Sequence, residues 1–339
     1  MRSRVVRFDE IGGPEVLRVV DQRAFAPGPG EVLLRVEAIG LNRAEAAFRG
    51  GQYFEQPAFP ARIGYEASGM VLAVGSGVTS FTAGDAVSVL PGFSMSKHGV
   101  YGDWAVVPAG AVIVRPAGMD AITGAAVWMA CLTAYGAIVD LGGIGAGDAV
   151  VITAASSSVG IAAIQICNML GAVPIALTRD PNKADALRAQ GAAHVVVGTA
   201  DTAVEAVARA TAGRGARLVF DPVAGPAVLA LAEMLGPGGL MVLYGNLSGQ
   251  AAETPFPFMA AVGKGLAVRG YLVFELIHDP ARRAAAIRFI AEGVADARLK
   301  PVIAKTFELD GIVAAHRYLE SNQQIGKIVV TTGLAYRHG

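Results

Sequence analysis

The stretch Gly147-Asp148-Ala149-Val150-Val151-Ile152-Thr153-Ala154-Ala155-Ser156-Ser157-Ser158-Val159-Gly160 decides the fold of this chain. A turn dipeptide leads into a short apolar run, then into small residues and an amphipathic segment, 161–170. This order predicts a buried strand, a tight loop and a helix. Small side chains let backbone N–H groups approach a pyrophosphate, and the helix N-terminus adds partial positive charge. The spacing Ala155-x-Ser157-x-x-Gly160 replaces Gly-x-Gly-x-x-Gly and predicts a dinucleotide phosphate site.

The three serines at the centre of this loop have two interpretations. Serine is a preferred helix N-cap, so Ser156, Ser157 and Ser158 suit an ordinary strand-to-helix junction. Their N–H and hydroxyl groups, with the neighbouring N–H of Val159, can also donate to a pyrophosphate. The strand–helix pattern on either side favours this second interpretation.

From about residue 122 the chain alternates between apolar runs of strand length and amphipathic runs of helix length. The predicted strands are 150–153, 173–178, 194–197, 216–220, 240–244 and 266–270. Helices are predicted at 159–170, 181–190, 202–211, 226–235 and 280–293. The pattern predicts an α/β fold with a doubly wound, parallel, six-stranded Rossmann sheet.

The first third of the chain shows short apolar runs separated by Gly/Pro turns, which predict a small β-barrel. The tail repeats strand, helix and strand at 304–308, 311–321 and 327–331, and we expect it to rejoin that barrel. The predicted domains are therefore 1–122 plus 296–339, and 123–295, the dinucleotide-binding domain.

Composition excludes several functions. The 28 basic and 28 acidic residues cancel, which argues against electrostatic capture of nucleic acid or an anionic membrane. The apolar segment 123–139 is too short for a bilayer span and predicts a buried helix. Two cysteines, Cys131 and Cys167, suit a reducing compartment, and the chain starts with an alternating run rather than a signal segment. We therefore expect a cytoplasmic protein with a small-molecule substrate.

The end of the second predicted strand bears on cofactor choice. NAD-binding proteins usually place a carboxylate there, to accept from the ribose 2′-hydroxyl. This strand ends at Thr178-Arg179, and Arg179 and Lys183 suit a 2′-phosphate. Asp180 lies beyond the expected position, and the residues from Asp180 to Lys183 could instead simply begin the next helix. The pattern favours NADPH over NADH.

Four marks in order carry a family resemblance. They are Gly40-Leu41-Asn42, Gly64-Tyr65-Glu66-Ala67-Ser68-Gly69, Leu132-Thr133-Ala134-Tyr135, and the stretch from Ala154 to Gly160 with Gln165. The chain resembles the medium-chain dehydrogenase/reductase superfamily, in the zinc-free quinone oxidoreductase branch related to ζ-crystallin. The resemblance runs from residue 1 to about 332, and it implies that the second domain is a GroES-like β-barrel.

The departures from the zinc enzymes of that family indicate a protein without a metal. Asn42 or Arg43 stands where those enzymes carry a cysteine, and Tyr65 replaces a histidine ligand. The five histidines, at 98, 194, 278, 316 and 338, are scattered, and we expect each on the surface or in a loop. Zinc catalysis needs three protein ligands and an open position, so it is not expected.

The resemblance also nominates site residues. Asn42 and Tyr53 match positions beside the nicotinamide, and we expect them to act in catalysis as donors to the substrate oxygen. Further cofactor contacts are implied for Thr133, Tyr244, Asn246 and Lys327. For two of these positions a structural interpretation stays open: Tyr53 as a half-buried anchor, and Thr133 as a helix residue bonded to its own backbone.

Aromatic side chains are expected to line the substrate pocket, although such side chains are also common in a core. The expected pocket residues are Phe48, Tyr65, Phe93 and Trp128. Segment 91–101 is predicted to be a loop beside it. Arg43 and Glu45 are expected to form a solvated pair on a short helix.

The predicted function is metal-independent hydride transfer from NADPH to a quinone or an α,β-unsaturated carbonyl compound. The alternatives are a zinc-type alcohol dehydrogenase and a non-catalytic NADPH-binding sensor or accessory protein. The resemblance also implies a homodimer, paired edge to edge through the sixth strand of the Rossmann sheet, within 266–274.

Overall fold

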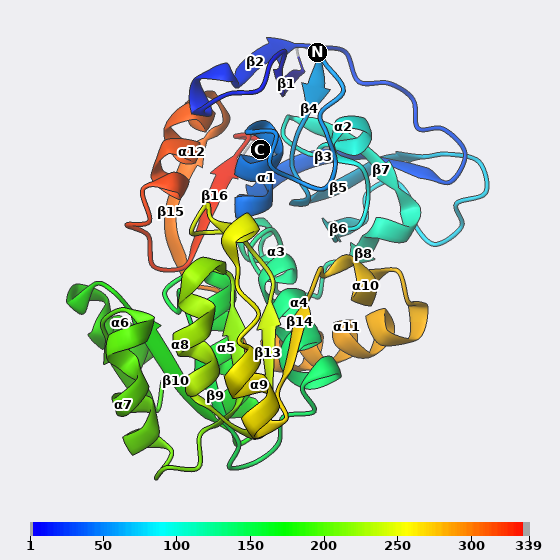
Figure 1. Ribbon diagram of the computed structural model, residues 1–339. Helices are drawn as coiled ribbons and strands as arrows, with labels where there is room; N and C mark the ends of the chain where they lie inside the picture. Colours follow the sequence, from blue (N-terminus) through cyan, green and yellow to red (C-terminus); the bar gives the residue numbers. More distant parts are fainter. Residues whose placement is uncertain (1–2, 335–339) are drawn as a thin grey trace. The chain divides into compact units, whose positions relative to one another are not determined.

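The Gly147–Gly160 stretch lies at the centre of a six-stranded parallel sheet in the computed structural model, which describes residues 3–334 (Figure 1). The strand order is β11-β10-β9-β12-β13-β14, which is the doubly wound order predicted from the sequence. The strands are β9 (Ala149–Ile152), β10 (Val173–Thr178), β11 (His194–Val197), β12 (Ala216–Asp221), β13 (Leu235–Leu243) and β14 (Ala267–Gly270). All neighbouring pairs are parallel.

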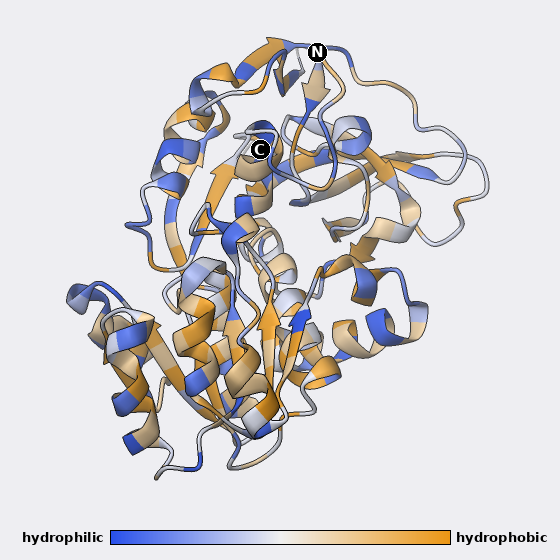
Figure 2. Cartoon of the chain, in the orientation of Figure 1, coloured by the Kyte–Doolittle hydropathy of each residue, from blue (hydrophilic) through white to orange (hydrophobic). Residues whose placement is uncertain are grey.

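Helices connect these strands or follow the last of them, as the alternating pattern predicts. They are α5 (Ser158–Met169), α6 (Ala184–Ala189), α7 (Ala200–Ala210), α8 (Val228–Glu233), α9 (Phe258–Lys264), α10 (Phe274–Ile277) and α11 (Pro280–Ala295), with a 3-10 turn (Pro181–Lys183) before α6. Val151, Ile175 and Met241 are among the strand residues that form the core with apolar faces of these helices. Figure 2 shows the strands as largely hydrophobic, and α6 and α7 as mixed.

The N-terminal part and the tail form a second set of sheets. A seven-stranded sheet has the order β15-β16-β3-β5-β6-β8, and β7 also pairs with β3. Its strands are β3 (Glu31–Gly40), β5 (Glu66–Val74), β6 (Ala86–Val89), β7 (Trp104–Pro108), β8 (Val112–Val114), β15 (Ile303–Glu308) and β16 (Lys327–Thr331). A small sheet holds β1 (Arg4–Phe8), β2 (Arg18–Asp21) and β4 (Ala61–Arg62). The predicted return of the tail is confirmed, because β16 pairs antiparallel with β3.

Short helices interrupt these strands. They are α1 (Arg43–Arg49), α2 (Met95–His98) and α12 (Ile312–Glu320), with 3-10 turns at Pro14–Val16, Ala109–Ala111 and Leu309–Gly311. The segment 91–101, expected as a loop, therefore contains one helical turn. Ser94 caps that turn by accepting a hydrogen bond from the N–H of Lys97.

The apolar segment near residue 130 is helical from Ala121 to Leu141, through α3 (Ala121–Gly124), α4 (Trp128–Tyr135) and a π-helical turn (Gly136–Leu141). By length and composition alone this helix could cross a membrane. However, 83% of its most apolar window is buried inside the protein, as in the core helix of a soluble protein.

The chain divides into two compact units. Unit 1 comprises residues 1–129 and 303–339, and unit 2 comprises residues 130–302. The domain limits expected from the sequence were 122/123 and 295/296. Unit 1 holds the mixed sheets and unit 2 the Rossmann sheet.

Candidate functional site

The loop after β9 in unit 2 has the geometry of an anion site. Ser157 is the N-cap of α5, and its hydroxyl accepts from the N–H of Gly160 at 3.0 Å. A Cβ at position 160 would lie 2.5 Å from the carbonyl oxygen of Ala155, so only glycine fits there. The first N–H groups of a helix have no acceptor within it. Those of Ser158 and Val159 can therefore serve a phosphate.

Lys183 extends this loop with a positive charge. Its side chain is buried, and Nζ donates to Oγ of Ser156 at 3.3 Å. Burial lowers the pKa of Lys183, while nearby Asp180 raises it. Two of the expected phosphate contacts, Ser156 and Lys183, are thus in direct contact although 27 positions separate them.

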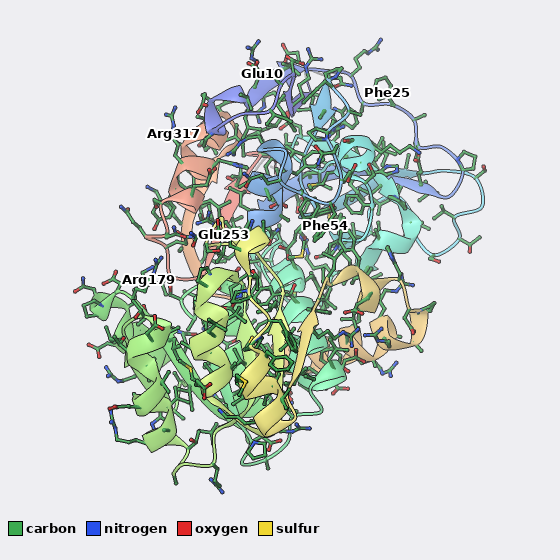
Figure 3. All side chains as sticks on the ribbon, in the orientation of Figure 1. Glu10, Phe25, Phe54, Arg179, Glu253 and Arg317 are labelled. Atoms are coloured by element: carbon green, nitrogen blue, oxygen red, sulfur yellow. The ribbon has the colours of Figure 1, made fainter. Side chains whose placement is uncertain are left out.

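The tip of β10 carries no carboxylate aimed at a ribose. Thr178 ends the strand, and its hydroxyl accepts from the N–H of Asp180 at 3.2 Å. The Asp180 carboxylate accepts from the N–H of Asn182 at 2.9 Å, so it caps the next turn. Arg179 is exposed at the surface of unit 2 (Figure 3). The two cations expected from the sequence therefore flank the phosphate loop and the strand tip.

The other expected cofactor residues of unit 2 differ in exposure. The ring of Tyr244 stacks on Phe220, with centroids 4.1 Å apart. Asn246 is exposed, and its side-chain oxygen accepts from the N–H of Ala251 at 3.0 Å. Thr133 is buried in α4.

Asp221 is a site-organising residue that the sequence did not suggest. It is fully buried at the end of β12, where Oδ1 accepts from the Thr153 hydroxyl and Oδ2 accepts from the N–H of Ala224 at 2.7 Å. Burial raises the pKa of Asp221. Ala154 and Ala224 have φ values of 45° and 56°, which favour glycine. Backbone strain of this kind is common at functional sites. Here it occurs at the ends of β9 and β12.

Unit 1 contains a buried ionic cluster, defined here as Asn42, Glu45, Glu66 and Lys327. Nζ of Lys327 donates to Oε2 of Glu66 at 2.5 Å and to Oδ1 of Asn42 at 2.6 Å. The Asn42 amide nitrogen lies 3.2 Å from the carbonyl oxygen of Gly40 and 3.3 Å from Oε1 of Glu45. The polar atoms of Asn42 and Lys327 are thus engaged inside the cluster.

Glu45 corrects one expectation. It was expected to form a solvated pair with Arg43, but its side chain is fully buried. Its carboxylate accepts from the backbone N–H of Asn42 at 2.6 Å and from that of Tyr65 at 3.2 Å. Arg43 instead donates to Asn322. Burial raises the pKa of Glu45 to about 7, although the Lys327 ammonium acts in the opposite direction.

The buried ionic cluster is a poor site for a metal ion, because the Lys327 ammonium already neutralises the Glu66 carboxylate. Across residues 3–334, no group of three or more His, Cys, Asp and Glu side chains is placed to hold a metal ion.

The expected aromatic residues of unit 1 fall into two groups. Tyr53 is half-buried, and its ring lies 6.2 Å from that of Tyr65, which in turn lies 5.5 Å from that of Phe93. Phe48 packs edge-on against Phe8 in the core. Trp128 is also almost fully buried. Tyr53, Tyr65 and Phe93 therefore form a continuous aromatic group, in which Tyr65 and Phe93 are buried, as are Phe48 and Trp128.

The histidine expectation was wrong for His316. This residue is fully buried in α12. Its ring accepts a hydrogen bond at 2.7 Å from Arg49, which is also buried, and this contact satisfies the ring nitrogen in the core. His194 and His278 are exposed, as expected. His98 is partly buried in α2. His338 lies outside the described residues.

Two family descriptions match parts of this chain. "Zinc-binding dehydrogenase" matches residues 158–292, and "Alcohol dehydrogenase GroES-like domain" matches residues 28–117. The first segment lies within unit 2 and the second within unit 1, so the sheets of unit 1 are GroES-like. The fold and the phosphate loop together define a two-domain, dinucleotide-dependent oxidoreductase.

Relatives support the same class. A 2-haloacrylate reductase from Burkholderia sp is 30% identical over 94% of this chain and 96% of that protein. A quinone oxidoreductase from Pseudomonas aeruginosa is 33% identical over 65% and 74%. The synaptic vesicle membrane protein VAT-1 homolog of Rattus norvegicus is 29% identical over 95% and 82%. The chain belongs to the medium-chain dehydrogenase/reductase superfamily, a family of oxidoreductases.

Solved structures agree. A quinone oxidoreductase from Pseudomonas syringae has a TM-score of 0.90 at 26% identity, covering 97% of this chain and 99% of that one. The Escherichia coli quinone oxidoreductase complexed with NADPH has a TM-score of 0.88 at 27% identity, with the same coverage. A protein described as an NAD-dependent alcohol dehydrogenase has a TM-score of 0.88 at 30% identity, covering 97% and 100%.

Proposed function

We propose that this protein reduces quinones or α,β-unsaturated carbonyl compounds with NADPH and without a metal ion. The observation that carries the proposal is the contact of Lys183 with Ser156, at the N-terminus of α5 and close to the exposed Arg179. Two cations beside a capped helix N-terminus suit a cofactor that carries a 2′-phosphate. The NADPH complex of the Escherichia coli relative supports the same choice.

The residues of unit 2 fit this cofactor. The N–H groups of Ser156, Ser158 and Val159 are proposed to hold the pyrophosphate, and Lys183 and Arg179 the 2′-phosphate. Thr133, Tyr244 and Asn246 remain proposed contacts near the nicotinamide. When bound, NADPH supplies the hydride.

In unit 1, the hydroxyl of half-buried Tyr53 is the proposed donor to the substrate oxygen. Asn42 keeps a role in the site, but a different one from a direct donor: its amide joins Lys327 to Glu45 within the ionic cluster. Lys327 is proposed to neutralise Glu66 in the same cluster rather than to contact the cofactor. Phe93 and Tyr65 are proposed to shape the apolar side of the substrate pocket.

Metal independence is proposed from the same cluster. A zinc ion would have to displace the Lys327 ammonium from Glu66 and use the neutral phenol of Tyr65 as a ligand. Burial raises the pKa of Tyr65 well above that of free tyrosine, so this phenol is a poor source of an anionic ligand.

The test is an NADPH-oxidation screen at 340 nm with 9,10-phenanthrenequinone, benzoquinone and several enones, with NADH in parallel and metal analysis of the purified protein. We expect turnover with at least one acceptor, a preference for NADPH, and less than one equivalent of zinc per chain. NADPH binding without turnover of any acceptor, or activity that is lost with a chelator and restored by zinc, would contradict the proposal.

One neighbour gives a second candidate. The protein described as an NAD-dependent alcohol dehydrogenase has the same fold at 30% identity. Oxidation of alcohols with NAD⁺, measured in the same screen, would favour that function instead.

We further propose a cytoplasmic homodimer. Cys131 and Cys167 are buried free thiols, which suits a reducing compartment. Strand β14 forms one edge of the Rossmann sheet, and the preceding helix α9 exposes Phe258, Met259 and Val262. An open strand edge beside exposed apolar side chains supports pairing with a second copy of the chain.

A further inference from the structure

Phe54 is an exposed aromatic residue of unit 1. It is 83% exposed, more than any other large apolar residue among residues 3–334, and Figure 3 labels it. A single exposed apolar residue is common on protein surfaces and needs no explanation by itself. Two further observations, the support of its segment and the ring beside it, together distinguish Phe54 from the other exposed side chains.

The segment that carries Phe54 is tied to the start of α2. The carboxylate of Glu55 accepts three hydrogen bonds from residues 94–96, one from a serine hydroxyl at 2.5 Å and two from backbone N–H groups at 3.0 and 3.3 Å. The N–H of Ala58 donates to the hydroxyl of Ser96 at 3.1 Å. Four hydrogen bonds therefore hold the segment on the C-terminal side of Phe54.

This support has two consequences for a ligand of the segment. Because the backbone beside Phe54 is already fixed, a ligand that packs against the ring has little to order. Glu55 is the only charged residue between positions 50 and 60, and both of its carboxylate oxygens are engaged by the donors of residues 94–96. The segment therefore suits an uncharged, apolar ligand.

The ring beside Phe54 is that of Tyr53. The two ring centroids lie 5.3 Å apart, with an interplanar angle of 61°. Tyr53 is half-buried and is the proposed donor to the substrate oxygen. From Tyr53 the aromatic contacts continue to the buried rings of Tyr65 and Phe93. Phe54 is thus the outermost ring of this series, next to the residue that is proposed to touch the substrate.

We propose that Phe54 is a specificity-determining residue, which selects substrates that carry a flat aromatic group conjugated to the reacting carbonyl. The inference rests on the proposed function and names a substrate class for that site, the aryl-substituted enones and quinones. A substrate whose oxygen accepts from the Tyr53 hydroxyl can place its aryl group against the exposed Phe54 ring. Such a contact removes apolar area of both rings from water and adds the attraction of an aromatic pair. An alkyl group at the same position buries less area and forms no such pair.

The test compares two enones, 4-phenylbut-3-en-2-one and pent-3-en-2-one, which differ only in a phenyl or a methyl group on the same double bond. Phe54→Ala should lower kcat/KM for the phenyl compound about 5–20-fold and for the methyl compound less than about twofold. A general effect on folding or on NADPH binding would lower both values equally and would leave their ratio unchanged. The ratio of the two values is therefore the readout.

Two further variants serve as controls. Phe54→Tyr keeps the ring and should retain the preference for the phenyl compound. Phe25→Ala removes another exposed ring of unit 1, since Phe25 is 60% exposed and its centroid lies 5.8 Å from that of Trp104. This variant should leave the ratio as in the wild type.

A second measurement needs no turnover. Isothermal titration of the protein with 4-phenylbut-3-en-2-one, in the presence of NADP⁺, which has no hydride to give, measures the Kd of the phenyl compound. Phe54→Ala should raise this Kd about 5–20-fold, and Phe25→Ala should leave it within about twofold.

The two measurements separate the failure of this inference from that of the proposed function. A wild type that reduces enones, with the same ratio in Phe54→Ala, would overturn the inference and leave the proposed function standing. A wild type that reduces no enone or quinone, but binds the phenyl compound through Phe54, would overturn the proposed function and support the recognition of aryl groups. Absence of both turnover and binding would overturn both.

Discussion

Arg49 donates from its guanidinium to Nδ1 of His316 at 2.7 Å, although the two residues are 267 positions apart. Both side chains are almost completely buried. Arg49 also donates to the carbonyl oxygen of Gly12 at 3.0 Å and to the carboxylate of Glu320 at 2.7 Å. A ring nitrogen that accepts from a permanently charged guanidinium cannot also hold a proton, so this contact requires neutral His316.

The pH dependence of stability follows from this contact. Burial, with a smaller effect of Arg49, lowers the pKa of His316 from 6.5 to about 3. Between these values the unfolded chain binds a proton that the folded protein does not, so stability falls as pH falls below 6.5. From pH 7 to pH 5, the contribution of His316 should decrease the free energy of unfolding by about 1–2 kcal/mol. Urea denaturation of wild type and His316→Gln at both pH values checks this; an equal pH dependence in both would contradict it.

Lys327→Met should destabilise the protein strongly. The substitution keeps most of the side-chain volume but leaves the buried carboxylate of Glu66 without its ammonium partner. Removing one partner of a buried ion pair costs about 3–5 kcal/mol. Lys305→Met, on the exposed part of β15, is the control and should change stability by less than about 1 kcal/mol. Urea denaturation at pH 8 measures both, and equal effects would argue against the charge-pair interpretation.

Lys183→Ala and Arg179→Ala should weaken NADPH selectively. Hydrogen bonds to charged groups contribute about 1.5–3 kcal/mol, so each substitution should raise the Kd for NADPH roughly 10–100-fold. The Kd for NADH should change much less, because NADH lacks the 2′-phosphate. Arg188→Ala is the control, since Arg188 pairs with Asp185 on the exposed side of α6. Fluorescence titration measures the Kd of both cofactors for each variant. An equal loss of affinity for NADH and NADPH would argue against a 2′-phosphate site.

Ala154→Gly should stabilise the protein. Ala154 has a φ of 45°, a left-handed conformation that costs a residue with a Cβ about 1–2 kcal/mol. Glycine loses about 0.5–1 kcal/mol in entropy, which leaves a net gain of up to about 1 kcal/mol. Ala208→Gly, at an exposed position within α7, should act in the opposite direction by about 1 kcal/mol. Melting temperatures of the two variants should therefore move to opposite sides of the wild-type value.

The proposed dimer can be tested on α9. Met259→Glu with Val262→Glu places two carboxylates among side chains that are now 79% and 67% exposed. Light scattering should show a change from about twice 34.7 kDa to 34.7 kDa, with the far-UV spectrum unchanged. Leu72→Glu on β5, also exposed, is the control and should remain dimeric. A monomeric wild type would contradict the dimer.

The sequence predicted the parts of the protein that depend on local pattern. The strand–loop–helix at Ala155 to Gly160, the six parallel strands and the return of the tail were all predicted, because each leaves a periodic or turn signal in adjacent residues. The capping role of Asp180 was one of two interpretations that the residues allowed.

The buried charges were not predicted, because their partners are distant in the chain. Glu45 looked like one half of a surface pair with Arg43, and His316 like a surface or loop residue. Each is buried through a partner that its neighbours in sequence do not reveal, as Arg49 is for His316. Only the fold brings Lys327 to Glu66, across 261 positions.

The order of synthesis gives this last contact a consequence. Unit 2 is continuous from 130 to 302, whereas unit 1 is interrupted by it. Glu66 therefore leaves the ribosome long before the lysine that neutralises it. A nascent chain that stops between residue 302 and β16 holds the complete Rossmann segment, but in its first domain the buried carboxylate of Glu66 lacks its ammonium partner. The last strand to be synthesised, β16, is therefore needed to complete the interior of the domain that is synthesised first.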